Sequence, residues 1–234
     1  MKTLVFLHGW GASGAAWTRQ AADFAGGFRV LAPDLPAWDP AWLAAYLQGL
    51  RLKDSVLVGW SLGGMVLLEA LPRLSEPAGG LVLVGVAAAF CRGPGQPFGQ
   101  EAAVVRAMRR RLGTDPGRVL REFAARCLAP GEEAFREEAA AMFAFRPPAA
   151  RLARGLDYLL QKDLRGLLPG VPGRVAVVQG EADAIVPPDQ GRFLAQRHAG
   201  ARLFLLPGAG HLPFLTQAGA FNGILREFMR DLEF

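Results

Sequence analysis

The 234-residue sequence has few cysteines and no long apolar run. Cys91 and Cys127 are its only cysteines, and they form neither a disulfide framework nor the closely spaced pairs of a metal knuckle. We interpret them as free buried thiols. The longest apolar run, residues 81–90, falls well short of the roughly 20 residues of a membrane helix, and residues 1–10 lack the apolar core and cleavage site of a signal peptide. We therefore expect a soluble cytoplasmic protein without a membrane segment.

Lysine is also scarce, because 23 of the 26 basic residues are arginines, and the net charge is +5. The excess lies between Arg92 and Arg165, where 14 basic residues stand against 9 acidic ones, while the rest of the chain has 12 of each. A basic surface in this interval favours an acidic partner. Genomic base composition explains the arginine bias equally well, alongside the abundant Ala, Gly and Pro, so both explanations stay open.

Short apolar segments rich in Val and Leu recur along the chain and are punctuated by Gly, Pro or Asp. Their apolar residues are continuous rather than alternating, which is typical of strands in a parallel sheet covered on both faces. Helix-length segments such as 65–74, 189–199 and 218–232 alternate with them. The pattern predicts a doubly wound α/β domain with a mostly parallel sheet of about six strands and helices on both faces. The expected strands are 3–9, 29–34, 55–60, 81–86, 174–180 and 202–208.

The interval 92–166 breaks this rhythm, because it has helical periodicity and no strand pattern. In its segment 116–128 the apolar side chains fall on one helix face, at i, i+3, i+4 and i+7. We interpret 92–166 as a helical cap inserted into a core formed by 1–91 and 167–234. The helical segments of the cap are 101–113, 116–128, 132–145 and 147–161.

The motif GWSLG, from Gly59 to Gly63, matches G-x-S-x-G between an expected strand and an expected helix. Glycines are needed there because the turn is strained and a side chain would collide with the neighbouring strand or helix. Ser61 is thereby exposed at the carboxyl edge of the sheet, in front of a helix N-terminus. The alternative is a serine that caps the helix. The coincidence of motif and context favours a nucleophile.

A serine hydroxyl becomes a strong nucleophile only when a base takes its proton and a carboxylate holds that base. Of the three histidines, His211 follows the last expected strand, where a loop can return it to the sheet edge. His198 is interpreted as a solvated helix residue and His8 as a residue that shapes its loop. Asp183 is the candidate carboxylate because it directly follows a strand, although a turn-forming role is its alternative. The order Ser61, Asp183, His211 is the one expected for an α/β-hydrolase fold.

A tetrahedral intermediate needs two N–H donors for its oxyanion. The residue after the serine, Leu62, supplies one backbone N–H. A loop that carries Gly9 and Gly11 can turn the backbone N–H of Trp10 toward the same point. We expect the indole of Trp10 to line the acyl pocket, with ordinary aromatic packing as the alternative for the ring.

Taken together, the segments LHGWG with Trp17, GWSLGG, DLRGLLPGV, DAIVP and GHLPF resemble the serine α/β-hydrolases and, more narrowly, the pimeloyl-acyl-carrier-protein methyl ester esterases of biotin synthesis. The resemblance implies a catalytic triad of Ser61, Asp183 and His211. It also implies that cap arginines dock the carrier protein. Implied substrate contacts are Trp10, Leu62 and the cap stretch Phe123, Ala124, Ala125, Arg126 and Cys127. The docking candidates are Arg106, Arg109 and Arg110, which can share one face of a helix, and Arg118 and Arg121 on the next helix.

We therefore expect a serine carboxylesterase that works through an acyl-serine, on a methyl ester whose acyl chain is held by an acidic acyl carrier protein. No metal or organic cofactor is expected, because the protein supplies nucleophile, base and oxyanion donors. We expect a monomer with no nucleic-acid or membrane partner. The alternatives are a broad-specificity short-chain carboxylesterase, a relative that uses the triad for lyase chemistry, and a non-catalytic binding protein.

Overall fold

The computed structural model describes residues 2–144, 147–230 and 232. The helices expected at 132–145 and 218–232 contain Phe145 and Asp231, which lie outside the described residues. Four other residues of the expected cap and core also lie outside the described residues: Met1, Arg146, Glu233 and Phe234.

The core of the protein is a six-stranded sheet in the order β2-β1-β3-β4-β5-β6. All five adjacent strand pairs in the described chain are parallel. The inner strands β1, β3, β4 and β5 are buried along their whole length, which is why their sequences are continuously apolar. The predicted fold class is confirmed. The strands are β1 Thr3–Leu7, β2 Arg29–Leu31, β3 Ser55–Trp60, β4 Gly80–Val84, β5 Val175–Gly180 and β6 Arg202–Leu206.

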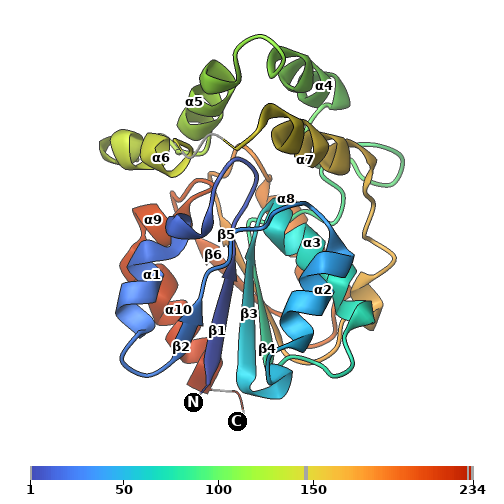
Figure 1. The fold of residues 1–234 in the computed structure, drawn as a ribbon, viewed down its shortest axis with the longest axis vertical. Helices are drawn as coiled ribbons and strands as arrows, with labels where there is room; N and C mark the ends of the chain where they lie inside the picture. Colours follow the sequence, from blue (N-terminus) through green and yellow to red (C-terminus); the bar gives the residue numbers. More distant parts are fainter. Residues whose placement is uncertain (1, 145–146, 231, 233–234) are drawn as a thin grey trace.

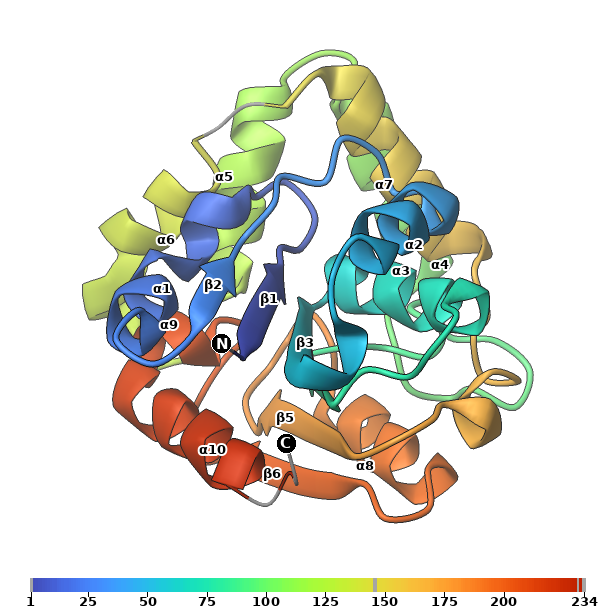
Figure 2. The ribbon, with the colours of Figure 1, turned by 60° about the horizontal axis from the view of Figure 1, so that its bottom comes forward.

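Helices cover both faces of the sheet (Figures 1 and 2). The helices α1 (Thr18–Phe24) and α10 (Ala218–Arg230) lie on one face, and α2 (Pro40–Gln48), α3 (Leu62–Ala70) and α8 (Pro188–Arg197) lie on the other. The short helix α9 spans Pro213–Thr216. The helix expected at 65–74 starts earlier, directly after Ser61, and its last turn is a 3-10 segment, Leu71–Arg73, because the ring of Pro72 cannot continue an α-helix. Within the described residues, none of the helices is long and apolar enough to cross a membrane.

Four further helices lie over the carboxyl ends of the strands (Figure 1). They are α4 (Ala102–Arg111), α5 (Pro116–Arg126), α6 (Arg136–Met142) and α7 (Ala149–Gln161), and all fall within the expected cap interval. The start of α5 is fixed by Asp115, whose carboxylate accepts the Arg118 backbone N–H at 2.8 Å, with Pro116 at the first helical position. After the cap the chain rejoins the core where the Leu164 N–H donates to the Ala88 carbonyl at 2.8 Å.

Two indole side chains of the core bind the first turns of α7 and so connect the cap to the core. The Nε1 of Trp10 donates to the Leu152 carbonyl at 2.8 Å, and the Nε1 of Trp38 donates to the Arg151 carbonyl at 3.2 Å. Both rings lie directly against Gly155, where a Cβ would come within 2.5 Å of Trp10 Cδ1. Gly155 therefore allows a close approach between cap and core that a larger residue would prevent.

Candidate active site

Ser61 lies at a strained turn between β3 and α3. Its φ of 53° and ψ of −125° make it the one non-glycine residue with a positive φ in the part of the chain that the structure describes. Such a backbone costs on the order of 1–3 kcal/mol and persists only where the surroundings impose it. Here the Ser61 N–H donates to the Val84 carbonyl of β4 at 2.9 Å, and its carbonyl accepts the Met65 N–H at 3.1 Å. The serine side chain is thereby held at the carboxyl edge of the sheet.

The glycines of the motif are required by close backbone contacts. A Cβ on Gly59 would lie 2.5 Å from the Cα of Gly64, and one on Gly63 would lie 2.3 Å from the carbonyl oxygen of His8. Gly64 is equally confined, because its Cβ would meet Val86 Cγ2 at 2.3 Å. The loop that carries Ser61 is thus packed against the end of β1 on one side and the end of β4 on the other.

Asp183 and His211 are hydrogen-bonded to each other. Asp183 Oδ2 lies 2.7 Å from His211 Nδ1, and both side chains are buried. The other oxygen, Oδ1, accepts the backbone N–H groups of Ile185 and Val186, each at 2.8 Å. A carboxylate held in this way fixes the proton of the imidazole on Nδ1. The lone pair of Nε2 is then free to accept a proton.

The Nε2 atom of His211 is buried and has no hydrogen-bond partner among the described residues. Buried ring nitrogens usually have one, so this atom is poised for a group that arrives with the substrate or from the serine. Ser61 and His211 lie at the same edge of the sheet, and no hydrogen bond between their side chains is recorded in the described residues. Gly85 lies close to both residues. It directly follows Val84, whose carbonyl accepts the Ser61 N–H, and a Cβ placed on Gly85 would lie 3.0 Å from His211 Nδ1.

The sequence analysis missed a further side-chain donor to the Asp183 carboxylate, Gln179 on β5. Its Nε2 donates to Asp183 Oδ2 at 3.2 Å and to the Val186 carbonyl at 3.0 Å. A fully buried glutamine at the end of a strand of apolar residues was the available signal, because a buried amide needs partners.

Trp10 and Leu62 flank the serine from two different elements. Leu62 is the first residue of α3, so its N–H belongs to the group that a helix leaves without intrahelical partners. Trp10 precedes Gly11, whose φ is 76°, in the loop after β1. The Trp10 ring is 2% exposed and packs edge-on against Phe123, with a centroid distance of 5.0 Å.

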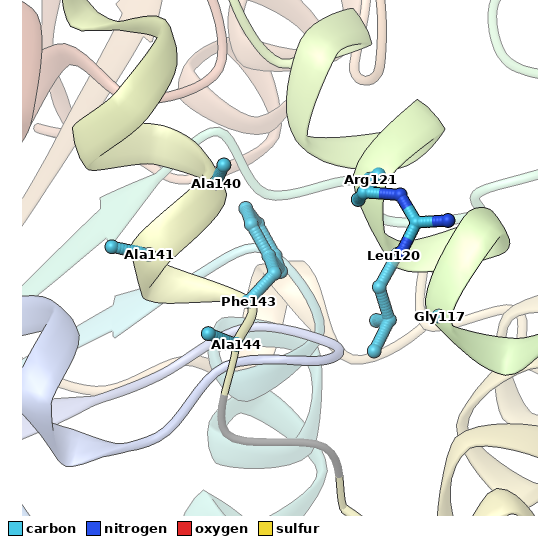
Figure 3. Close-up of a pocket in the computed structure, with 7 residues that line it drawn as sticks. All are labelled: Gly117, Leu120, Arg121, Ala140, Ala141, Phe143 and Ala144. Atoms are coloured by element: carbon cyan, nitrogen blue, oxygen red, sulfur yellow. The ribbon is translucent and has the colours of Figure 1, made fainter.

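Two adjoining cavities of about 290 and 390 Å³ lie among the cap helices, and Gly117, Leu120 and Arg121 of α5 line both, whereas Ser61, Asp183 and His211 line neither. Figure 3 shows the α5 residues on one side of the smaller cavity and Phe143 with three alanines of the α6 segment on the other. The cavity walls contact the loop after β1, because a Cβ on Gly11 would lie 2.8 Å from Leu120 Cδ2 and 3.2 Å from Phe143 Cδ1. The sequence placed Leu120 on the apolar face of the helix expected at 116–128, but it predicted neither Leu120 nor Phe143 as a cavity residue.

The expected cap stretch is divided between two sides of α5. Phe123 contacts both Trp10 and Phe143, and Ala124 and Cys127 are buried. Ala125 and Arg126 are exposed, and Arg126 Nη2 donates to the Gln100 side chain at 3.3 Å. This division follows from the helix period, which turns Ala125 and Arg126 outward. Burial raises the pKa of the Cys127 thiol well above its usual range.

The other two histidines have different environments. His8 is fully buried, its Nδ1 bonds to the Gly9 carbonyl at 2.9 Å, and its Nε2 accepts the Leu35 N–H at 3.0 Å. Burial lowers the pKa of His8 to about 4, so the ring is neutral at pH 7. His198 follows α8 and bonds through Nε2 to the Val171 carbonyl at 2.9 Å. Both rings bond to the backbone, His8 through both nitrogens and His198 through Nε2 alone, since its Nδ1 is buried without a partner in the described residues.

The expected docking arginines also differ in their contacts. Arg109 binds Asp157, with Nη2 and Oδ2 2.9 Å apart, and Arg118 binds Glu122 at 2.8 Å. Arg106, Arg110 and Arg121 are exposed, and no carboxylate partner is recorded for them among the described residues. The three exposed guanidiniums leave an unneutralised positive charge on the cap.

The chain is similar to known proteins over most of its length. The model of the alpha/beta hydrolase family matches residues 4–224. A pimeloyl-[acyl-carrier protein] methyl ester esterase from Aromatoleum aromaticum is 34% identical over 234 residues, covering 91% of this chain and 92% of its own. The enzyme of the same name from Methylococcus capsulatus is 30% identical over 239 residues, covering 97% and 94%.

Solved structures share the fold at lower identity. An esterase from Exiguobacterium antarcticum superposes with a TM-score of 0.89 at 21% identity, covering 99% of this chain and 92% of its own. A bromoperoxidase from Bacillus anthracis does so with a TM-score of 0.85 at 23% identity, covering 98% and 92%. The different names of these two proteins illustrate that one fold hosts several reactions. With a family match that spans nearly the whole sequence, the chain belongs to the alpha/beta hydrolase family.

Proposed function

We propose that this carboxylesterase uses Ser61 as its nucleophile to cleave the methyl ester of an acyl chain held by an acyl carrier protein, in biotin synthesis in the cytoplasm. The observation that carries the proposal is the buried Asp183–His211 pair, with its 2.7 Å hydrogen bond and its unpartnered Nε2, at the edge where Ser61 emerges. This arrangement contains the parts that serine acyl transfer needs.

The chemistry proceeds in two steps. His211 Nε2 takes the Ser61 hydroxyl proton as the oxygen attacks the ester carbonyl, and the backbone N–H groups of Trp10 and Leu62 stabilise the oxyanion. The imidazolium then protonates the methoxide as it leaves, which releases methanol and forms the acyl-serine. Water, activated by the same imidazole, hydrolyses this acyl-enzyme. Asp183 holds the ring in the required tautomer throughout.

The smaller of the two cavities among the cap helices suits an apolar acyl chain. Its walls are Leu120, Phe143 and three alanines, with Arg121 adding one positive charge, while the larger cavity is lined also by Asp115 and Leu152. The methyl ester and the carrier are carried over from the printed names of the relatives from Aromatoleum aromaticum and Methylococcus capsulatus. The exposed arginines of α4 suit an acidic carrier, since rim charges steer association.

A comparison of two substrates tests the carrier. Reversing Arg106 and Arg110 to Glu should raise KM for a carrier-bound methyl ester several-fold and leave hydrolysis of p-nitrophenyl acetate unchanged, because only the larger substrate touches this surface. A matched double reversal, Lys53→Glu with Arg73→Glu, changes the same charge on exposed core positions and should affect neither substrate. If the α4 variant handles both substrates like the wild type, the carrier is refuted and a broad-specificity carboxylesterase takes its place.

A further inference from the structure

The backbone of His211 is held by the cap as well as by the core. Its N–H donates to the Cys127 carbonyl at 2.8 Å, and the N–H of Gly210 donates to Glu132 Oε2 at 3.1 Å. Residues 127–132, which we name the cap clamp, follow directly on α5. From the core, the Trp60 indole donates to the His211 carbonyl at 3.1 Å. The base is therefore fixed between the nucleophile strand and the cap clamp.

Glu132 is an unusual residue for this place because it is a buried carboxylate, 6% exposed. Its Oε2 accepts the Ala129 N–H at 2.7 Å as well as that of Gly210, while Oε1 is buried and has no partner in the described residues. Buried carboxylates are rare, because burying one costs free energy unless hydrogen bonds compensate for the lost hydration. Here the bonds close the cap clamp on itself and attach it to the residue before the base.

The contact is also a close one. A Cβ on Gly210 would lie 2.5 Å from the Cys127 carbonyl oxygen, 2.7 Å from the Ala129 nitrogen and 2.8 Å from Glu132 Oε2. Two backbones therefore touch at this point without an intervening side chain. A displacement of the cap clamp is transmitted directly to the loop that carries His211.

We propose that Glu132 is a positioning residue for the base, and that through it the cap sets the rate of turnover as well as substrate binding. This inference rests on the proposed function, in which His211 is that base. The helix that ends at the cap clamp, α5, is the one whose Gly117, Leu120 and Arg121 line both cavities. The helix α5 therefore lines the cavities in which a substrate would bind, and it leads into the cap clamp that positions the imidazole.

Replacing the acceptor gives the sharpest test. In Glu132→Leu the N–H of Gly210 loses its partner, and a displacement of the base of about 1 Å lowers turnover on the order of 100-fold. We expect kcat for p-nitrophenyl acetate to fall roughly 10- to 100-fold, and KM to stay within about 2-fold, because the cavity walls are unchanged. Glu132→Gln keeps an oxygen acceptor for both N–H groups and should restore kcat to within about 3-fold of wild type.

Active-site titration separates positioning from damage to the fold. A fluorophosphonate incubated to completion counts competent sites, and kcat is expressed per labelled site. A merely structural role predicts fewer labelled sites with an unchanged kcat per site, and that result would overturn the proposal, as would a Leu variant within about 3-fold of wild type. A Gln variant as slow as the Leu variant would equally refute it. Glu137→Leu, the same change at an exposed position of α6, is the matched control and should match wild type.

Two further arms keep the test decisive. Should Glu132→Leu not fold, Glu132→Asp keeps the charge and withdraws the acceptor by about 1.5 Å, one carbon–carbon bond, and the same loss of kcat per site is expected. Ser61→Ala identifies a failure of the proposed function itself. If that variant retains activity, the serine mechanism is wrong. If activity requires Ser61 but not Glu132, only the positioning role is refuted.

Discussion

Asp183→Asn perturbs the hydrogen bonds of the site with almost no change in shape. The asparagine oxygen can still accept the backbone N–H groups of Ile185 and Val186, which the carboxylate holds at 2.8 Å each. Its NH2 group then faces two donors whose hydrogen bonds Oδ2 accepts in the wild type, His211 Nδ1 at 2.7 Å and Gln179 Nε2 at 3.2 Å. Two donors cannot share a hydrogen bond, so the imidazole must adopt the tautomer with its proton on Nε2.

That tautomer cannot accept the serine proton. The substitution in a Ser-His-Asp triad costs about 10⁴-fold in kcat, which corresponds to about 5.5 kcal/mol of transition-state stabilisation. The two retained backbone bonds limit the effect on folding, and we expect the free energy of unfolding to fall by only about 1–3 kcal/mol, the cost of a lost hydrogen bond to a charged group.

The assay is kcat for p-nitrophenyl acetate at saturation, with the free energy of unfolding measured by urea titration. Asp189→Asn is the control, since it makes the same substitution at a half-exposed position of α8 that only pairs with Arg192 at 3.2 Å. It should keep full activity. A folded Asp183→Asn enzyme whose kcat lies within tenfold of wild type would refute the assignment of the carboxylate.

Two other predictions concern buried groups around the loop that carries Ser61. Because burial lowers the pKa of His8 to about 4 while an unfolded imidazole titrates near 6.5, the neutral ring contributes stability that is complete above about pH 6.5 and is lost as the pH falls toward 4. The free energy of unfolding contributed by His8 falls by about 3 kcal/mol over this range. Urea titrations at pH 7 and pH 4 should show this difference in the wild type and not in His8→Gln. Gly63→Ala places a methyl 2.3 Å from the His8 carbonyl oxygen, so it should destabilise the fold by about 1–3 kcal/mol and lower kcat, whereas Gly219→Ala, which meets nothing within 4 Å, should not. Equal melting temperatures for the two alanine variants would contradict the packing described for the motif.

Much of the fold follows from local patterns. Each of the six strands lies within or next to a predicted one, because strands buried on both faces must be continuously apolar. The motif around Ser61 was equally accessible, since its serine and glycines lie within five positions of each other, although the contacts that hold it, to His8, Val84 and Val86, are distant in sequence. The start of α3 was placed too late because glycines weaken the helical pattern of Gly63 and Gly64, although packing against β1 and β4 keeps both inside the helix.

Contacts between distant segments could not be read in the same way. Nothing near Glu132 in the sequence indicates that its carboxylate meets Gly210, 78 positions later. The pairing of Arg109 with Asp157 likewise joins two helices, so it was invisible in a charge count that treated the cap arginines alike. The sequence could name Asp183 and His211 as candidates from their places after strands, but their separation of 2.7 Å required the structure.

The central claim is that Ser61 forms an acyl-enzyme, and covalent labelling tests it most directly. The protein is incubated with a fluorophosphonate, digested, and analysed by peptide mass spectrometry, with Ser61→Ala in parallel. The account predicts a single adduct on the peptide that contains Ser61, no adduct in Ser61→Ala, and esterase activity in that variant reduced by several orders of magnitude. A stoichiometric adduct on another residue, or turnover by Ser61→Ala within tenfold of wild type, would contradict it.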